Sequence, residues 1–523
     1  MTDVVGVTGA HARIRDPRLW ALLLALAYFG AAAYGGTLRP VGGYGKETDF
    51  YARFAPDADR LARGEFPKEG HTGPGYALLL LGASQLTHDH FTSGKLLSAV
   101  TGALAFLGAW ALFRRCFGDR AALVGGLAML ASPDVLVYSM QATTDIPFLA
   151  LCLAAILALI GSGLARASLA GVLTGLAYLV RYNAVFLLPT ALLWFGVLDP
   201  ARGSRASRAS RVAVYLLASF LTVAPWLWLN AVHRGSPFYT TNYQNIAAAA
   251  YYSPGGEDPE AFRTRFHSFG DVVRYDPARL GRHYVRTLGM IVANSLGAPQ
   301  TLLPVGLGAV AGTILVLRGF AAPPGVLVPV SVVLYILPLA LVHWERRYFF
   351  YVAVCYAGLA GHALVTLGDA LRARWRLGPA LSALGVPLLV LLALAPGTVF
   401  AAGQVTRMLR HQPLELLAAA AYLTRAAPAD ARLMARKPHL AYLSRRPWVY
   451  LPEVASLDEL HDVLRREPAA YLLCDRLTSA MRPALAFLAT PQDGIPWLQP
   501  VYADRPHELV IYRVTAFDGL RVR

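Results

Sequence analysis

The chain has 523 residues, of which 56% are hydrophobic and only 15% charged, and its mean hydropathy is +0.44. Soluble globular proteins carry roughly 25% charged residues, so this composition excludes a water-soluble fold for most of the chain. Four cysteines among 25 tyrosines and 22 phenylalanines exclude a disulfide-stapled or a disordered protein. The net charge of +16 would indicate nucleic-acid binding on a soluble domain. Many basic residues lie between apolar runs, where membrane topology explains them better, so we expect no nucleic-acid partner.

Eleven membrane-spanning helices are predicted, since a helix needs about 20 mainly apolar residues to cross the hydrocarbon core of a bilayer. Two long apolar runs, Thr287–Leu317 and Leu377–Val405, each contain one span with overhang. Two short runs, Ala121–Pro133 and Ala167–Val180, reach spanning length only with their flanking residues. The other seven predicted spans are Leu19–Leu38, Leu96–Phe113, Ile146–Ala165, Tyr182–Leu198, Val212–Val232, Gly319–Val342 and Tyr348–Leu367.

Arginine sets the expected orientation, because basic residues in short loops stay on the cytoplasmic side. With the N-terminus inside, the short outer links hold only Arg181, Arg346 and Arg347, and the other short loops are rich in arginine. A cleaved signal peptide is the alternative, but the first apolar run continues to Leu38. We expect a multi-pass protein of the inner (plasma) membrane with a cytoplasmic N-terminus (1–18), a transmembrane domain (19–400, outer loops 39–95 and 233–286) and an extracytoplasmic domain (401–523).

Two regions outside the predicted spans also show local structure. The apolar run Thr72–Thr87 is broken by Gly73-Pro74-Gly75 and is too short to cross, so we expect a helix along the membrane surface. The C-terminal region has no nucleotide or metal motif and is predicted to be a small α/β domain. The fold class expected is an all-α polytopic membrane protein with this domain appended. Its predicted elements are helices at Glu415–Arg425 and Ser456–Arg466, the latter opened by a capping box, and strands at Trp448–Leu451, Ala470–Cys474 and Glu508–Val514.

Charged residues at the outer helix ends are the candidates for chemistry. Asp134 and Asp145 bracket the tight outer link between the third and fourth spans, where acidic residues are costly and tend to mark function. Capping of the next helix is the alternative for Asp145. Arg181 and the run Glu345-Arg346-Arg347 also lie at outer helix ends. Arginine is suited to bind phosphate through paired hydrogen bonds, and snorkelling of the side chain to the interface is the alternative for each arginine.

Several short patterns follow one another in a particular order along the chain. In that order they resemble the GT-C membrane glycosyltransferases, in particular the protein-mannosyltransferase and aminoarabinose-transferase-like group (glycosyltransferase family 39), including rhizobial lipopolysaccharide transferase-like proteins. The resemblance covers about Leu19–Phe400, and the chain departs from the family at Gly73-Pro74-Gly75, where a double proline is usual. The patterns are Glu47-Thr48-Asp49-Phe50-Tyr51, Ala62-Arg63-Gly64, Gly73-Pro74-Gly75-Tyr76, Arg114-Arg115-Cys116-Phe117-Gly118, Ser132-Pro133, Tyr138-Ser139, Thr144-Asp145, Val180-Arg181-Tyr182-Asn183, Gly235-Ser236-Pro237-Phe238 and Glu345-Arg346-Arg347-Tyr348.

The resemblance implies transfer of a sugar from a polyprenyl-phosphate donor to a glycan, lipid or protein acceptor at the outer face, usually with inversion. By matching position, Asp49 would be the general base, and Asp145 would be a second carboxylate that orients the acceptor or the sugar. The donor phosphate would be bound by Arg181, Arg346 and Arg347, which stabilise charge on the leaving group. The residues expected to line the substrate cavity are Tyr51, Lys68, Glu69, His71 and Glu345.

No cofactor is expected, because the lipid-linked sugar is a substrate. Some relatives hold a divalent metal, for which His71 and His267 would be the candidate ligands here, but two lone histidines are more often polar loop residues, so we predict no metal. A multi-span lipid or solute transporter or flippase is the main alternative function, and it would place ionisable residues near the bilayer midplane. A polytopic assembly or sensor protein is a further alternative.

Overall fold

The computed structural model describes residues 16–68, 70–199, 204–252, 265–297, 303–375 and 379–515. The chain divides into two compact units. The helical unit consists of Met1–Thr37 and Asp57–Arg407, and the C-terminal unit consists of Leu38–Pro56 and Met408–Arg523. The chain therefore enters the C-terminal unit twice, first for a short segment after its first described helix and again for its last part.

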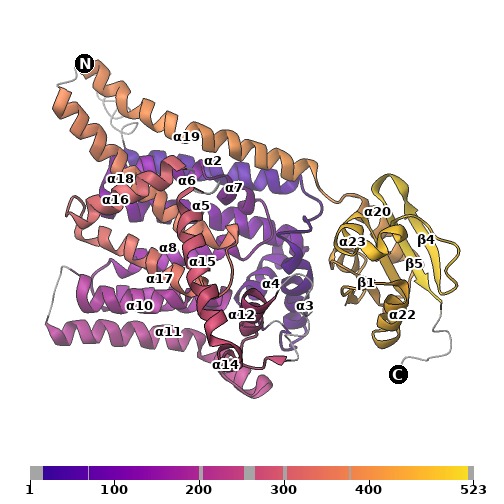
Figure 1. Ribbon diagram of the computed structural model, residues 1–523. Coiled ribbons are helices and arrows are strands. Elements are labelled where there is room, and N and C mark those ends of the chain that lie inside the picture. Colours follow the sequence, from indigo (N-terminus) through magenta and orange to yellow (C-terminus); the bar gives the residue numbers. More distant parts are fainter. Residues whose placement is uncertain are drawn as a thin grey trace. The chain divides into compact units, whose positions relative to one another are not determined.

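The helical unit contains long helices that run roughly parallel to one another (Figure 1). Their order along the chain follows the predicted apolar runs, which confirms the expected all-helical membrane body. The elements are α2 (Pro17–Thr37), α3 (Ala55–Ala62), α4 (Gly75–Thr87), α5 (His90–Phe117), α6 (Asp119–Leu130), α7 (Pro133–Ser139), α8 (Asp145–Leu159), α9 (Leu164–Val180), η2 (Tyr182–Phe186), α10 (Leu187–Leu193), η3 (Trp194–Leu198), α11 (Arg205–Arg234), α12 (Asn242–Tyr251), α14 (Phe269–Tyr275), α15 (Pro277–Gly297), α16 (Leu303–Leu317), η4 (Pro323–Val326), α17 (Leu327–Leu339), η5 (Arg346–Phe349), α18 (Phe350–Trp375) and α19 (Pro379–Arg410).

Among the described residues, four helices are long and apolar enough to cross a membrane: α2, α5, α11 and η5 with α18. The pair α6 and α7, bent by 66°, adds a fifth if it forms one span, and five further apolar segments are shorter. The chain is thus a multi-pass membrane protein, while the number eleven stays a prediction. The predicted run Thr287–Leu317 contains two helices, because α15 ends at Gly297 and α16 begins at Leu303.

Helices in this unit pack closely where one presents a glycine to the backbone of another. At Gly312 of α16, an added Cβ atom would lie 2.1 Å from the carbonyl oxygen of Leu359 in α18. A side chain at this position would therefore push the two helices apart. Small residues at helix contacts serve the same purpose in membrane proteins generally, where dispersion contacts between close backbones stabilise association.

The C-terminal unit is built on a five-stranded sheet with the order β2-β1-β3-β5-β4. Strands β2 (Trp448–Tyr450), β1 (Leu433–Ala435) and β3 (Tyr471–Cys474) are parallel, and β5 (Leu509–Val514) and β4 (Leu498–Asp504) are antiparallel to their neighbours. The predicted α/β domain is confirmed, including three of its strands. The helical elements are η1 (Phe50–Phe54), α20 (Glu415–Ala426), α21 (His439–Leu443), α22 (Leu457–Arg466), α23 (Arg476–Met481), η6 (Pro483–Ala489) and η7 (Arg505–His507).

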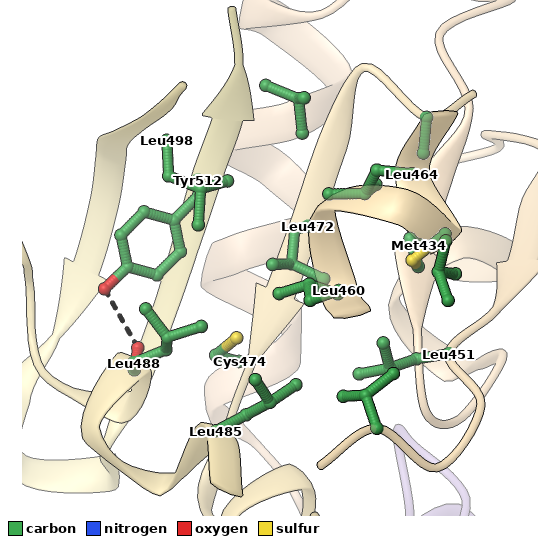
Figure 2. Close-up of a cluster of buried hydrophobic side chains, with 14 of the residues drawn as sticks. Met434, Leu451, Leu460, Leu464, Leu472, Cys474, Leu485, Leu488, Leu498 and Tyr512 are labelled. Atoms are coloured by element: carbon green, nitrogen blue, oxygen red, sulfur yellow. Dashed lines mark hydrogen bonds between the residues drawn. The ribbon is translucent and has the colours of Figure 1, made fainter. Parts of the chain in front are cut away.

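Side chains alternate between two cores on the opposite faces of this sheet. Leu472 and Tyr512 point into one core with α22 and η6, and the Tyr512 hydroxyl donates to the Leu488 carbonyl at 3.0 Å (Figure 2). Leu433 and Ile511 belong to the other core, which α20 and α21 cover. This period of two is expected when both faces of a strand are buried.

The N-cap half of the predicted capping box at the start of α22 is formed, and the Glu459 side chain reaches back one residue further than the box requires. The Ser456 hydroxyl accepts from the Glu459 backbone N–H at 3.1 Å, and the Glu459 carboxylate accepts from the Ala455 N–H at 2.7 Å. One backbone donor that the helix itself cannot satisfy, the Glu459 N–H, therefore gains a partner, and so does the Ala455 N–H in the segment before the helix.

Candidate active site

Asp145 is the first residue of α8, and its carboxylate is engaged by side chains from two elements. It accepts a hydrogen bond from the Thr143 hydroxyl at 2.6 Å and one from Nη1 of Arg181 at 2.5 Å. Neither Asp145 nor Thr144 makes a side-chain cap to α8. The capping alternative for Asp145 is therefore wrong, and the side chain forms a buried ion pair instead.

Arg181 directly follows α9 and is enclosed rather than extended toward the interface. Its Nη1 also donates to the Thr144 hydroxyl at 3.0 Å, and its guanidinium lies 5.3 Å from the ring centre of Tyr348. Only 13% of the side chain is exposed. The snorkelling alternative therefore does not apply to Arg181, because its guanidinium is held by a carboxylate, a hydroxyl and an aromatic ring.

Asp134 and Arg346 form a second pair, in which two parallel hydrogen bonds join the groups. Arg346 donates from Nε to Oδ2 at 3.1 Å and from Nη2 to Oδ1 at 3.0 Å. Asp134 lies in the first turn of α7 and is buried, whereas a third of the Arg346 side chain, 33%, is exposed. This is the fork geometry that makes arginine selective for planar anions.

Arg347 and Glu345 form the third pair, in the link that leads into η5. Nε of Arg347 lies 2.9 Å from Oε1 of Glu345, and Nε2 of His343 lies 3.6 Å from Oε2. Burial raises the pKa of Glu345, but the hydrogen bond from His343 and the charge of Arg347 outweigh it and lower that pKa to about 2. Glu345 is therefore ionised at any ordinary pH.

Tyr348 connects the first and third pairs. The guanidinium of Arg347 lies 5.4 Å from the centre of the same ring that Arg181 approaches. The structure thus brings together five of the predicted site residues. We term these five, together with Asp134 and Tyr348, the arginine cluster. Its members are Asp134, Asp145, Arg181, Glu345, Arg346, Arg347 and Tyr348.

Three carboxylates balance three guanidinium groups in the arginine cluster, so any further anion must share an arginine that already has a partner. Arg346 and Arg347 retain exposed surface, 33% and 20% of their side chains. These two can turn part of their donor set toward a ligand. Arg181 is enclosed, so it is better suited to hold Asp145 in place.

The Gly73-Pro74-Gly75 motif lies against the end of α9, directly before Arg181. A Cβ atom on Gly73 would come within 2.4 Å of the Leu179 carbonyl oxygen, and one on Gly75 would also meet the backbone of Leu179. Because a proline at 73 or 75 would add atoms in this contact, the departure from the family's double proline has a steric reason here. The start of α4 is therefore packed on the segment that carries Arg181.

The remaining predicted residues lie elsewhere. In the helical unit, the Lys68 N–H donates to the Asp57 carboxylate at 2.9 Å, and Nδ1 of His71 lies 3.1 Å from the Thr241 hydroxyl. Asp49 and Tyr51 belong to the C-terminal unit. Glu69 lies outside the described residues. Within the ranges that the structure describes, no group of three or more His, Cys, Asp or Glu side chains is arranged to hold a metal ion.

Sequence reasoning left two cluster members out of the predicted site. Asp134 had a signal, because a carboxylate at a membrane edge needs a partner, but its partner Arg346 is 212 residues away. Tyr348 belongs to the pattern Glu345-Arg346-Arg347-Tyr348, but that pattern assigned it no role.

Comparison with known proteins agrees with this architecture. Residues 71–228 match the family described as dolichyl-phosphate-mannose-protein mannosyltransferase. This match runs from α4 into α11 and so includes Asp134, Asp145 and Arg181. A comparison with curated protein sequences finds no match.

Two solved structures share the fold. ArnT from Cupriavidus metallidurans, bound to undecaprenyl phosphate, is 16% identical with a TM-score of 0.56, and the alignment covers 96% of this chain and 99% of ArnT. The oligosaccharyltransferase AglB from Archaeoglobus fulgidus, in complex with an inhibitory peptide and a dolichol-phosphate, is 13% identical with a TM-score of 0.59, covering 87% of this chain and 70% of AglB.

The chain thus has the GT-C membrane fold that ArnT and AglB share, and part of it matches the mannosyltransferase family. The mannosyltransferase family is the one that its sequence matches, over residues 71–228. The expected polytopic helical membrane fold is thus confirmed.

Proposed function

We propose that the chain transfers a sugar from a polyprenyl-phosphate donor to an acceptor at the extracytoplasmic face of the plasma membrane, with inversion at the anomeric carbon. The observation that supports this most is the arginine cluster, in which Arg346 and Arg347 are fixed by carboxylates yet remain partly exposed. ArnT and AglB, which share the fold, bind undecaprenyl phosphate and dolichol-phosphate, and both lipids belong to the same chemical class as the proposed donor.

In the proposed reaction, the acceptor oxygen forms a bond to the anomeric carbon and its proton passes to Asp49. The bond between the anomeric carbon and the phosphate oxygen breaks, and the polyprenyl phosphate leaves with added negative charge. Guanidinium donors held in place before the reaction stabilise such charge without reorganisation. Arg346 and Arg347 are proposed to take this role, so the proposal includes no resident metal. Arg181 supports Asp145, which is proposed to orient the sugar or the acceptor.

Asp49 is the proposed general base, and the structure of the C-terminal unit supports it over the neighbouring Glu47. Glu47 is fully buried and accepts hydrogen bonds from Arg39 and from the Gly43 N–H. Asp49 has 32% of its side chain exposed and lies 4.0 Å from Arg53. A carboxylate must meet the acceptor hydroxyl to take its proton, and only Asp49 has the surface to do so.

A transfer assay in proteoliposomes with a labelled polyprenyl-phosphate sugar tests the proposal, with the acceptor chosen from the glycan difference between a deletion strain and its parent by mass spectrometry. Asp49→Asn is expected to lower kcat by at least about 100-fold, the contribution of a general base. Asp59→Asn is the control, because Asp59 is an exposed carboxylate on α3, within the same predicted outer loop (39–95), and pairs with His90. Wild-type rates in Asp49→Asn would refute the base, and lipid movement without sugar transfer would indicate a flippase.

A further inference from the structure

The carboxyl ends of the parallel strands β2, β1 and β3 meet at one edge of the sheet in the C-terminal unit. In open α/β sheets this edge is the usual place for a ligand. Here the segments that follow β1 and β3 contribute His439 and Asp475, and the chain's own segment 38–56, which carries Asp49, lies against them. We term this segment the Asp49 loop.

The first half of the Asp49 loop is fastened by Tyr44. Its hydroxyl donates to Oδ2 of Asp475 at 3.0 Å, and its ring meets the edge of the His439 ring at 4.9 Å. Tyr44 also packs against the core that α20 and α21 cover. Nε2 of His439 lies 3.3 Å from the Gly43 carbonyl oxygen, in line with a hydrogen bond to the loop backbone.

The second half of the loop is fastened by the two aromatic residues that directly follow Asp49. Tyr51 lies 4.4 Å from the His439 ring and 5.1 Å from the Tyr442 ring, and Phe50 meets Tyr442 at 6.0 Å. These ring contacts lie within the range that stabilises aromatic pairs. Asp49 is therefore bracketed by anchors on α21 and on the end of β3.

Contacts within the loop also connect its two halves. Arg39 and Glu47 form a buried ion pair, and the Tyr51 hydroxyl accepts from the Gly42 N–H at 2.8 Å. Opening such a pair would leave a buried charge uncompensated. The Asp49 loop is therefore held both by contacts within itself and by contacts with the rest of the C-terminal unit.

We propose that His439 and Asp475 are positioning residues that act through Tyr44 and Tyr51 to hold Asp49 in the orientation in which it takes the acceptor's proton. The C-terminal domain then has a catalytic purpose, because it is the support of the general base. This inference rests on the proposed function, in which Asp49 is that base.

The test uses the full-length protein in lipid and the variant Tyr44→Phe, which removes the bond to Asp475 but keeps the ring against His439. We expect kcat to fall about tenfold, in line with the cost of misplacing a reacting group by a fraction of an ångström, with KM for the donor changed less than twofold. In the Asp49→Asn background, Tyr44→Phe is expected to have no further effect on kcat. Tyr422→Phe on α20, whose ring lies beside Tyr502, is the matched control and should leave both constants unchanged.

Hydrogen exchange measured by mass spectrometry separates this inference from the proposed function. Tyr44→Phe and His439→Ala should each raise exchange at least threefold over 38–56 and leave α22 unchanged. Unchanged exchange over 38–56 in both variants would overturn the docking, whatever the activity of Asp49→Asn. Faster exchange with wild-type kcat would overturn the positioning role, and an active Asp49→Asn would overturn the base while leaving the docking intact.

Discussion

Arg346 donates two parallel hydrogen bonds, of 3.0 and 3.1 Å, to Asp134, which lies 212 residues earlier in the sequence. The carboxylate is buried, and the guanidinium is the more exposed partner. One arginine can therefore both neutralise a charge inside the helical unit and offer remaining donors to a ligand. Substitution of each partner, alone and together, separates these two roles.

Arg346→Ala is expected to destabilise the protein and to weaken use of the lipid-phosphate donor. Removing one partner leaves Asp134 buried without compensation, which typically costs about 3 to 5 kcal/mol. The double variant Asp134→Asn with Arg346→Ala should recover much of the thermal stability but not the donor affinity. Thermal unfolding in detergent and a donor titration measure the two effects, and full recovery of donor affinity in the double variant would show that Arg346 has only a structural role.

Glu345→Gln is expected to lower KM for the donor, because it releases Arg347 from its carboxylate partner. With a pKa of about 2, Glu345 keeps its charge throughout the assay range, so substitution rather than acidification is needed to remove it. Arg347→Ala should raise KM instead. If both variants leave KM unchanged, Arg347 does not contact the donor phosphate.

Glu47→Gln should differ from Asp49→Asn in kind, although the two residues are neighbours. Glu47 is buried against Arg39, so its neutralisation is expected to destabilise the C-terminal unit by about 3 kcal/mol and to lower the amount of folded protein. Asp49→Asn should leave stability unchanged within about 0.5 kcal/mol and remove activity. Limited proteolysis of the C-terminal unit measures stability, and the transfer assay measures activity. Loss of stability in Asp49→Asn together with loss of activity alone in Glu47→Gln would show that the two roles are exchanged.

Acid is expected to loosen the C-terminal unit through His439. Burial lowers the pKa of His439 to about 3, and the hydrogen bond to Gly43 offsets this only in part, whereas an unfolded histidine titrates near 6.5. The unfolded chain therefore binds the extra proton between these values, so stability is complete above about pH 6.5 and falls toward pH 3, by about 1.4 kcal/mol per pH unit.

Hydrogen exchange over residues 433–450 as a function of pH measures this loss. His439→Phe should flatten the profile while keeping a ring against Tyr51. His507→Gln is the control, since Asp504 raises the pKa of the exposed His507 and its contribution has the opposite sign. An unchanged acid profile in His439→Phe would assign the sensitivity to another group.

Local patterns allowed much of the fold to be predicted. The capping box at Ser456 and the strands β2, β3 and β5 follow from sequence within a few residues. The missed strands have physical reasons, because β1 is only three residues long and β4 is an edge strand interrupted at Pro500.

The individual charged residues of the candidate site could be predicted from the sequence, but most of their ion-pair partners could not. Asp145, Arg181 and the run at Glu345 stood out as charges at helix ends. Their partners are fixed by packing between distant helices, as Asp134 and Arg346 show. The packing of the Asp49 loop with the C-terminal sheet depends likewise on side chains some 400 residues further along, which no local pattern specifies.

The two separate entries of the chain into the C-terminal unit have a consequence for biosynthesis. The Asp49 loop is synthesised about 400 residues before its anchors His439 and Asp475. Protein synthesis proceeds at roughly 5 to 20 residues per second, so the aromatic residues of the loop lack their packing partners for tens of seconds. A chain cut short before α21 would contain all the described helices of the helical unit and still lack the support for its proposed base, so the proposed sugar transfer would begin only after the C-terminal unit is made.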